Sequence, residues 1–162
     1  MLSDIELTVN GELRRLHVDD TTMLLDVLRT HLDLKAARFG CGAGQCGTCA
    51  VIVDGEEKAA CQLEVGNLGG KSITTLEGIG TPEHPHPLQT AFLELQAGQC
   101  GYCLSGILVG AKALIDRNPS PTRAEIAQAL AWHLCRCGAH NRILAAVALA
   151  AERMRTPAAV GA

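Results

Sequence analysis

The chain has 162 residues, of which 48% are hydrophobic and only 2% aromatic, and its formal net charge is -3. A chain of this length forms one large domain or two small ones, and we predict two small ones. The small net charge leaves no basic face, which argues against nucleic acid or an anionic membrane surface as a partner. The scarcity of aromatic rings leaves Leu, Ile, Val and Ala to build the core.

The amino terminus predicts no export and no membrane anchor. Residues 1–6 lack the basic region and apolar run of a secretory signal and carry no twin-arginine pair. No stretch that could span a membrane follows. Eight cysteines would favour disulfides in a secreted chain, but in a reducing compartment they favour bound metal. We therefore expect a cytoplasmic protein whose cysteines hold metal.

The first predicted element is a β-hairpin over residues 4–18. Asn10-Gly11, a dipeptide that favours a type I′ turn, separates two runs of alternating apolar residues. A helix should follow, because residues 19–22 offer an N-cap and an apolar stripe at helical spacing runs from Leu24 to Leu32. We expect this helix to pack across the hairpin.

The next segment is a loop rich in cysteine and glycine, Gly40-Cys41-Gly42-Ala43-Gly44-Gln45-Cys46-Gly47-Thr48-Cys49-Ala50. The spacing C-x4-C-x2-C is the plant-type arrangement of three of the four thiolate ligands of a two-iron, two-sulfur (2Fe-2S) cluster. Cys61 is the candidate for the fourth ligand, because it is the next cysteine along the chain. The glycines permit positive φ angles and let backbone amides approach the sulfur atoms. The alternative, a glycine-rich turn with structural thiols, explains this specific order of residues less well.

Strands are predicted on the far side of this loop. Residues 51–55 are typical of a strand that enters a tight turn, and residues 59–63 are expected to return as its partner, carrying Cys61. A last short strand is expected at Ile73 and Thr74. We therefore predict a small mixed sheet crossed by one helix over residues 1–76. Residues 77–87 contain three prolines and are typical of a linker.

The rest of the chain has a helical pattern. We predict a bundle of four short helices over residues 88–156 and a tail over 157–162. Pro87 can begin the first helix, which should end near residue 97, and the second helix should cover about 105–116.

Capping signals predict the last two helices. Thr122 and Glu125 form a capping box for a third helix that ends near Leu130. Asn141 is expected to cap the fourth helix, which should reach about residue 154. Residues 143–151 are apolar almost all round, so we expect this helix to be buried on more than one side or to face a partner.

The other four cysteines form a C-x2-C pair, Cys100 and Cys103, and a C-x-C pair, Cys135 and Cys137. Helix ends in an antiparallel bundle can bring two such pairs together into a second four-thiolate site. The spacing alone also allows zinc. We favour iron and sulfur because the first half already has the pattern of an iron-sulfur site.

Two cysteine sets in this order resemble the small iron-sulfur subunit of the molybdenum hydroxylases, the family of xanthine dehydrogenase, aldehyde oxidoreductase and carbon monoxide dehydrogenase. The motifs that carry the resemblance cover nearly the whole chain and include Gln99-Cys100-Gly101-Tyr102-Cys103, Cys135-Arg136-Cys137, Thr75-Leu76-Glu77-Gly78 and His86-Pro87-Leu88-Gln89. The resemblance implies an α+β fold. An N-terminal plant-type ferredoxin-like β-grasp domain would precede a C-terminal four-helix bundle, each carrying one 2Fe-2S cluster.

Two short segments depart from the usual pattern of that family. Leu104-Ser105 stands where the family often has Thr-Pro, and Gly138-Ala139-His140 stands where it often has Thr-Gly-Tyr. Neither departure touches a cysteine. The variant Cys-x-Ser-Gly resembles the branch that hydroxylates N-heteroaromatic rings, such as nicotinate dehydrogenase and isoquinoline oxidoreductase, and we expect nicotinate dehydrogenase to be the nearer of the two.

The resemblance implies an electron-transfer subunit of a hydroxylase for nicotinate-type substrates. A large partner subunit would hold molybdopterin cytosine dinucleotide, with Gln99 and Cys137 as the contacts to its pterin; the Gln99 amide offers both a donor and an acceptor. Electrons would cross the two 2Fe-2S clusters to an external acceptor, either a flavin (FAD) subunit or haem-carrying cytochrome c domains. This chain would have no catalytic residue, because a one-electron carrier makes and breaks no bonds.

Three other functions stay open. The first is the small subunit of an aldehyde-oxidising molybdenum enzyme. The second is a free-standing two-cluster carrier, which the small net charge and the apolar last helix disfavour. The third is a zinc-binding interaction module.

A last group of residues concerns the surroundings of the clusters. The amides of Gly42, Gly44, Gly47 and Gly101 are expected to tune the reduction potentials. Arg136 either adds charge there or forms a surface salt bridge. We interpret the six histidines as structural, with His133 and His140 solvated or capping, and we interpret Tyr102 and Trp132 as packed core aromatics.

Overall fold

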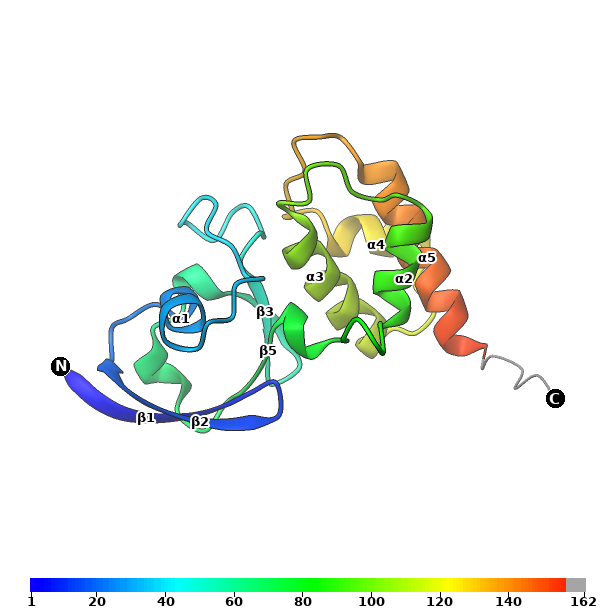
Figure 1. The fold of residues 1–162 in the computed structure, drawn as a ribbon. Coiled ribbons are helices and arrows are strands. Elements are labelled where there is room, and N and C mark those ends of the chain that lie inside the picture. The colour runs from blue at the N-terminus through cyan, green and yellow to red at the C-terminus, as the bar shows by residue number, and fades with distance from the viewer. Residues whose placement is uncertain (157–162) are drawn as a thin grey trace.

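The computed structural model describes residues 1–156, and the tail predicted for residues 157–162 lies outside the described residues. The fold is mixed α+β, with a five-stranded sheet in the first half and most of the helix in the second. Figure 1 shows the two halves side by side, with helix α3 (Leu104–Arg117) facing the sheet at strand β3 (Ala50–Val53).

The predicted hairpin is confirmed. Strands β1 (Leu2–Val9) and β2 (Glu12–Asp19) pair antiparallel, with Val9 opposite Glu12. The φ angles of Asn10 and Gly11 are 52° and 82°. Both values are positive, as a type I′ turn requires.

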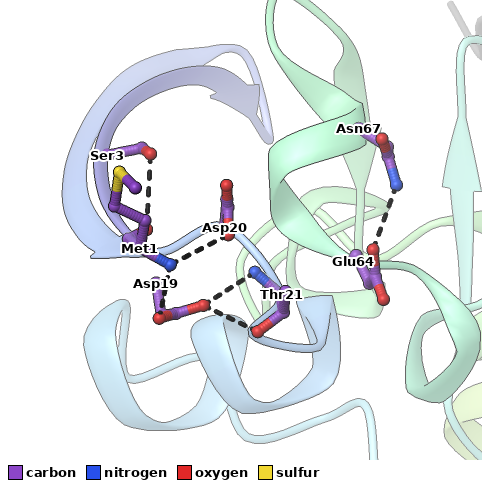
Figure 2. Close-up of polar contacts among 7 residues, drawn as sticks. All are labelled: Met1, Ser3, Asp19, Asp20, Thr21, Glu64 and Asn67. Atoms are coloured by element: carbon purple, nitrogen blue, oxygen red, sulfur yellow. Dashed lines mark hydrogen bonds and ion pairs between the residues drawn. The ribbon is translucent and has the colours of Figure 1, made fainter.

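Polar contacts close the open end of this hairpin (Figure 2). The Met1 ammonium donates to Asp19 at 2.8 Å and to Asp20 at 3.3 Å. Asp19 also accepts from the backbone N–H and the hydroxyl of Thr21, at 3.0 and 2.6 Å. The ammonium and Thr21 together hold the pKa of Asp19 well below its usual range.

The helix after the hairpin is shorter than predicted, and its predicted N-cap was wrong. Helix α1 (Leu24–Asp26) begins after Met23, which makes no side-chain cap, and continues as one π-helical turn, Val27–His31. Residues 20–22 instead form a turn in which the Thr22 N–H donates to the Asp19 carbonyl at 2.9 Å, and Met23, which follows, is bridged to Glu64. The apolar stripe is nonetheless buried, including Leu24, Leu25, Val27 and Leu28.

The sheet is mixed, as predicted, with the order β2-β1-β5-β3-β4. Strand β5 (Ser72–Thr74) runs parallel to β1 and antiparallel to β3, while β4 (Glu56–Ala59) forms the edge beside β3. The prediction of a returning strand over 59–63 was wrong, because β4 lies earlier in the chain, over Glu56–Ala59. The ladder stops at Ala59 and the chain turns into a 3₁₀ helix, Ala60–Gln62, which contains Cys61.

Helices α2 to α5 pack around a second core. Their bounds are α2 Pro87–Glu94, α3 Leu104–Arg117, α4 Arg123–Ala129 and α5 His140–Arg155. The capping box of Thr122 and Glu125 is confirmed at α4. Helix α2 ends earlier than predicted, and Gln96 beyond it has a φ angle of 47°.

Two details of α5 differ from the predictions. The predicted Asn141 cap was wrong: the N-cap is Ala139, whose methyl side chain cannot form a hydrogen bond, and the Asn141 side-chain carbonyl accepts from Arg123 at 2.9 Å. Burial follows one face of α5: Ile143, Val147 and Ala150 are buried, whereas Ala148 is exposed. The predicted burial on more than one side was therefore wrong.

A third, small apolar cluster joins the two halves. Ala50 and Ile52 of β3 pack against Val109 and Ala113 of α3, with Trp132 partly buried against them. Small side chains let the helix lie close to the strand.

None of the helices described over residues 1–156 has the length and apolar character needed to cross a membrane.

Helix α2 carries a capping box that was not predicted from the sequence, and this box implies a pH dependence. His86 Nδ1 accepts from the Leu88 N–H at 3.2 Å, and the Gln89 side-chain oxygen accepts from the His86 N–H at 2.8 Å. Burial lowers the pKa of His86, the charge of Lys112 lowers it further, and Asp116 opposes them. A protonated Nδ1 cannot accept, so folding favours the neutral ring.

The cap should therefore contribute its full stability above the unfolded-state pKa of about 6.5 and lose it as the pH falls below that value. We expect His86→Ala to cost about 0.5–2 kcal/mol of unfolding free energy at pH 8. His86→Asn should keep the cap and show a smaller loss of stability between pH 8 and pH 5.5. Denaturant unfolding of the three proteins at both pH values measures this, and equal pH dependence in wild type and His86→Asn would contradict it.

Candidate metal centres

The first cysteine loop folds around its own sulfur atoms. The N–H groups of Ala43 and Gln45 donate to Cys41 Sγ at 3.3 and 3.2 Å, and the Cys41 N–H donates to Cys46 Sγ at 3.4 Å. Gly44 helps to make this path, with a φ angle of 68°. Amides that point at sulfur stabilise its anionic form, as expected around an iron-sulfur cluster.

Gln62 joins the fourth cysteine of this set to the loop. Its side-chain Nε2 donates to the Gly42 carbonyl and to the Cys61 carbonyl, each at 2.8 Å, and lies 3.7 Å from Cys61 Sγ. The 3₁₀ turn therefore presents Cys61 toward the loop. Gln62 was not predicted from the sequence, and its position next to the fourth cysteine was the available signal.

The four thiols of the first set lie in two pairs. Cys41 contacts Cys46, and Cys49 contacts Cys61, with Cys46 close enough to Cys49 to affect its pKa. The amide donors lower the pKa of the exposed Cys41 to about 6, with burial opposing them. Burial raises the pKa of Cys49 to about 12. Cys41 is thus exposed with its thiolate favoured, whereas Cys49 and Cys61 are buried.

The second set repeats this arrangement. Cys100 contacts Cys137, and Cys103 contacts Cys135. The Tyr102 N–H is the largest of the effects that lower the pKa of Cys100, while burial raises the pKa of Cys103 to about 12. At Cys135 burial works against ionisation, but backbone N–H groups, led by that of Ala139, more than offset it and lower the pKa.

The arrangement in pairs bears on which metal the thiols fit. Within residues 1–156 no group of three or more His, Cys, Asp or Glu side chains is placed to hold a single metal ion. A structural zinc ion needs four ligands around one point. A two-iron cluster bound by four cysteines instead takes two thiolates at each of two irons. Four thiols in two pairs, with backbone N–H groups aimed at sulfur, fit the donor set of a two-iron cluster.

Direct hydrogen bonds connect the two cysteine loops. The Leu134 N–H donates to the Cys46 carbonyl at 3.1 Å, and Cys135 is the next residue. The Tyr102 hydroxyl donates to the Phe39 carbonyl at 2.6 Å. In Figure 1 both loops, cyan and orange, project at the same end of the molecule. The two sets are thus neighbours across the contact between the halves.

Arg38 adds a positive charge between the loops. Its guanidinium donates to the Gly101 carbonyl at 2.8 Å, lies 5.3 Å from the centre of the Tyr102 ring, and helps to lower the pKa of Cys100. Tyr102 is half exposed, so its interpretation as a core aromatic was wrong. Arg136, the arginine singled out from the sequence, is exposed. Arg38 was not predicted, because it lies outside both cysteine motifs.

His133 is buried, contrary to the solvated or capping role expected from the sequence. Its Nε2 lies 2.7 Å from Oε1 of Glu57, with the carboxylate accepting, and the side chains are 1% and 11% exposed. Glu57 lies on β4, and no motif had indicated it. The other flanking histidine, His140, is exposed at the start of α5.

The two residues expected to contact a pterin lie together. Gln99 Nε2 donates to the Cys137 carbonyl at 3.1 Å, and Gln99 is exposed. Gln99 also borders a groove of about 550 Å³ whose walls include Phe92, Leu93 and Leu104. Leu93 is 77% exposed, so an apolar surface adjoins the second cysteine set.

Two family models for 2Fe-2S-binding domains match this chain. Residues 7–68 match the 2Fe-2S iron-sulfur cluster binding domain, and residues 75–148 match the [2Fe-2S] binding domain. One of the nicotinate dehydrogenase subunits of Pseudomonas putida is 46% identical over 97% of this chain and 100% of its own. The alpha subunit of the isoquinoline 1-oxidoreductase of Brevundimonas diminuta is 42% identical over 91% and 97%.

Solved structures have the same fold as this chain. The aldehyde oxidoreductase of Desulfovibrio desulfuricans superposes with a TM-score of 0.92 at 43% identity over 95% of this chain. This chain spans only 17% of that enzyme's chain.

Two 2Fe-2S-binding domains in one chain define an iron-sulfur electron-transfer protein. The chain belongs to the family of small iron-sulfur subunits of the molybdenum hydroxylases, and so is part of an oxidoreductase.

Gly40 provides a test of the first loop. A Cβ at this position would lie 2.7 Å from Cys46 Sγ. A free thiol can rotate away, but a thiol that binds iron cannot. We expect Gly40→Ala to fold and to lose one cluster, so that iron falls from about four to about two per chain. Gly69→Ala, where a Cβ would meet nothing within 4 Å, is the control. Full iron in Gly40→Ala would contradict the prediction.

Arg38 provides a test of the second set. Removing a positive charge beside a cluster disfavours its reduced, more negative form. We expect Arg38→Gln to lower the reduction potential of the second cluster. The ratio of reduced to oxidised cluster at a fixed potential should fall about threefold to tenfold, and a tenfold change corresponds to about 59 mV for one electron. Arg38→Lys should retain most of the potential. Redox titration followed by electron paramagnetic resonance measures both, and equal potentials in Arg38→Gln and wild type would contradict the prediction.

Proposed function

We propose that this chain holds two 2Fe-2S clusters and conducts electrons out of a molybdenum hydroxylase that acts on N-heteroaromatic, nicotinate-type substrates. The ligands proposed for the first cluster are Cys41, Cys46, Cys49 and Cys61, and for the second Cys100, Cys103, Cys135 and Cys137. The division into residues 1–76, a linker over 77–87 and a helical domain over 88–156 is part of the proposal.

The observation that carries this proposal is the hydrogen bond from the Leu134 N–H to the Cys46 carbonyl. It joins the peptide next to a ligand of the second set directly to a ligand of the first. A chain that held two unrelated structural metals would have no reason to connect the two ligand sets through one backbone contact. An electron carrier needs such a short connection, because electron transfer weakens steeply with distance.

The chain's own residues hold the ligands and set the local charge. Amides of Ala43, Gln45 and Tyr102 stabilise anionic sulfur, and Arg38 adds a positive charge between the loops. The molybdenum cofactor, proposed to be molybdopterin cytosine dinucleotide in a large partner subunit, would supply the substrate hydroxylation. No residue of this chain is proposed as catalytic.

The pterin contact is proposed at Gln99 and Cys137. Their mutual hydrogen bond leaves the Gln99 carbonyl oxygen and one amide hydrogen for a ligand edge. The apolar groove beside Gln99, including Leu93, would lie under the large subunit. An obligate partner of this kind accounts for an exposed leucine at that place.

The substrate class rests on the similar proteins. Both relatives named above are dehydrogenases or oxidoreductases whose names specify N-heteroaromatic compounds, nicotinate and isoquinoline. The second candidate is an aldehyde-oxidising complex, which the similarity to the aldehyde oxidoreductase structure favours. The acceptor is proposed to be an FAD subunit or haem-carrying cytochrome c domains, and the location the cytoplasm.

The test is to purify the chain with its large partner and to measure iron, zinc and molybdenum together with electron paramagnetic resonance spectra. We expect about four irons per small chain and two distinct rhombic signals after reduction. Nicotinate should reduce both clusters, whereas an aldehyde such as benzaldehyde should not. Reduction by the aldehyde alone would favour the second candidate.

Two variants assign the signals. Cys61→Ser should abolish the first signal and Cys103→Ser the second, while Ser105→Ala, next to the second set, should keep both. Zinc in place of iron at the second set, or a full iron complement in a chain that binds no partner, would contradict the proposal.

A further inference from the structure

The contact between the halves contains one buried polar pair, Glu57 and His133. Glu57 comes from the edge strand β4 of the sheet, and His133 lies between α4 and the second cysteine loop. The hydrogen bond between them is 2.7 Å long, and the side chains are 11% and 1% exposed. Desolvating such a pair costs free energy that an apolar pair would not cost. Its presence therefore calls for a reason other than stability.

Three glycines make room for this pair. A Cβ at Gly47 of the first cysteine loop would lie 2.3 Å from His133 Nδ1, and a Cβ at Gly110 of α3 would lie 2.5 Å from Glu57 Oε1. One helical turn earlier, a Cβ at Gly106 would lie 2.0 Å from the Gly47 carbonyl oxygen. The imidazole is thus enclosed where the first cysteine loop, α3 and β4 meet.

Among the described residues, Glu57 makes the only side-chain hydrogen bond to the ring. Within the described residues His133 Nδ1 is buried and has no hydrogen-bond partner. The imidazole therefore has one hydrogen bond, at Nε2, and is otherwise held by packing. Loss of the carboxylate would leave both ring nitrogens buried without a partner, which favours movement of the ring because unpaired buried polar atoms are costly.

Movement of His133 would directly disturb the hydrogen bond that joins the two cysteine sets. Leu134, the next residue, donates the hydrogen bond to the Cys46 carbonyl, and Cys135 follows it. The other contacts between the halves do not hold this segment: the apolar cluster around Ala50 and Val109 is non-directional. The hydrogen bonds of Tyr102 and Arg38 hold the segment around Gly101, before α3, and not Leu134 and Cys135.

We propose that Glu57 and His133 are positioning residues for electron transfer between the two clusters, because their buried hydrogen bond holds the Leu134 N–H against the Cys46 carbonyl. The inference rests on the proposed two-cluster function. It concerns the distance and the connection between the clusters, and it assigns neither residue a role as a cluster ligand.

The test uses the complex of this chain with its large partner, loaded with both clusters. Two quantities are measured: the magnetic splitting between the two reduced clusters in electron paramagnetic resonance at low temperature, and the rate at which an electron introduced at one cluster equilibrates with the other. We expect Glu57→Ala and His133→Ala to decrease the splitting and to slow equilibration.

Matched variants separate positioning from folding. Glu57→Gln keeps an acceptor oxygen and should restore most of the splitting. Glu56→Ala removes the neighbouring glutamate of the same strand, which is exposed and paired with Lys58, and should behave as wild type. Where an alanine variant does not assemble, Glu57→Asp, which withdraws the carboxylate by one methylene, should still alter the splitting.

The outcomes are distinguishable. A splitting and an equilibration rate equal to wild type in a loaded Glu57 or His133 variant, even one that unfolds more easily, would overturn the positioning role. A wild-type complex without two interacting clusters would instead overturn the proposed function on which this inference rests.

Discussion

The structure depends on how closely helix α3 approaches the first cysteine loop. Gly106 lies against the Gly47 carbonyl with no room for a side chain. Cys103 is the residue directly before α3, so the position of this helix also places the second cysteine set. Because backbone meets backbone at this contact, the two sets lie next to each other and not at opposite ends of two independent domains. A larger residue at either glycine would separate the halves.

Each cysteine set contains thiols in two different environments. Cys41 and Cys100 are exposed and receive backbone N–H groups, which lower their pKa values, whereas burial raises the pKa values of Cys49 and Cys103. The buried thiols stay protonated until a cation compensates the charge. Cluster binding must therefore release protons, and its free energy contributes to holding each loop in place. Cys41 and Cys100, the exposed cysteine of each set, favour the thiolate form that binds iron.

Apolar packing between the halves is limited. Each half has its own core, and a small cluster built on Ala50, Ile52, Val109 and Ala113, with Trp132 partly buried against it, joins them. Apolar packing of this kind is non-directional and does not by itself define a register. Directional contacts define this register, among them the hydrogen bonds of Arg38 to Gly101 and of His133 to Glu57. Rigid placement of the clusters thus depends on a few polar residues.

Much of this architecture was predictable because its signals are local. The Asn10-Gly11 turn, the capping box of Thr122 and Glu125, and the spacing of the eight cysteines each depend on residues near one another in the chain. The errors arose where a distant segment competes with a local preference. Asp19 bonds to Met1 and Thr21 and caps no helix, Asn141 accepts from Arg123, and strand β4 ends before Cys61 because that residue must turn toward the first loop.

By itself, the sequence determined the two cysteine sets, the class of fold and the family, because ligand spacing and hydrophobic period are properties of short stretches of chain. Only the tertiary structure decided how the sets face each other. Glu57 and His133 are 76 residues apart, and Arg38 and Gly101 are 63 apart. No local pattern marks either pair, since a glutamate on an edge strand or an arginine before a glycine-rich loop is ordinarily solvated. Their roles arise only when α3, with glycines at its contact face, lies against the first loop and excludes water from the space between the halves.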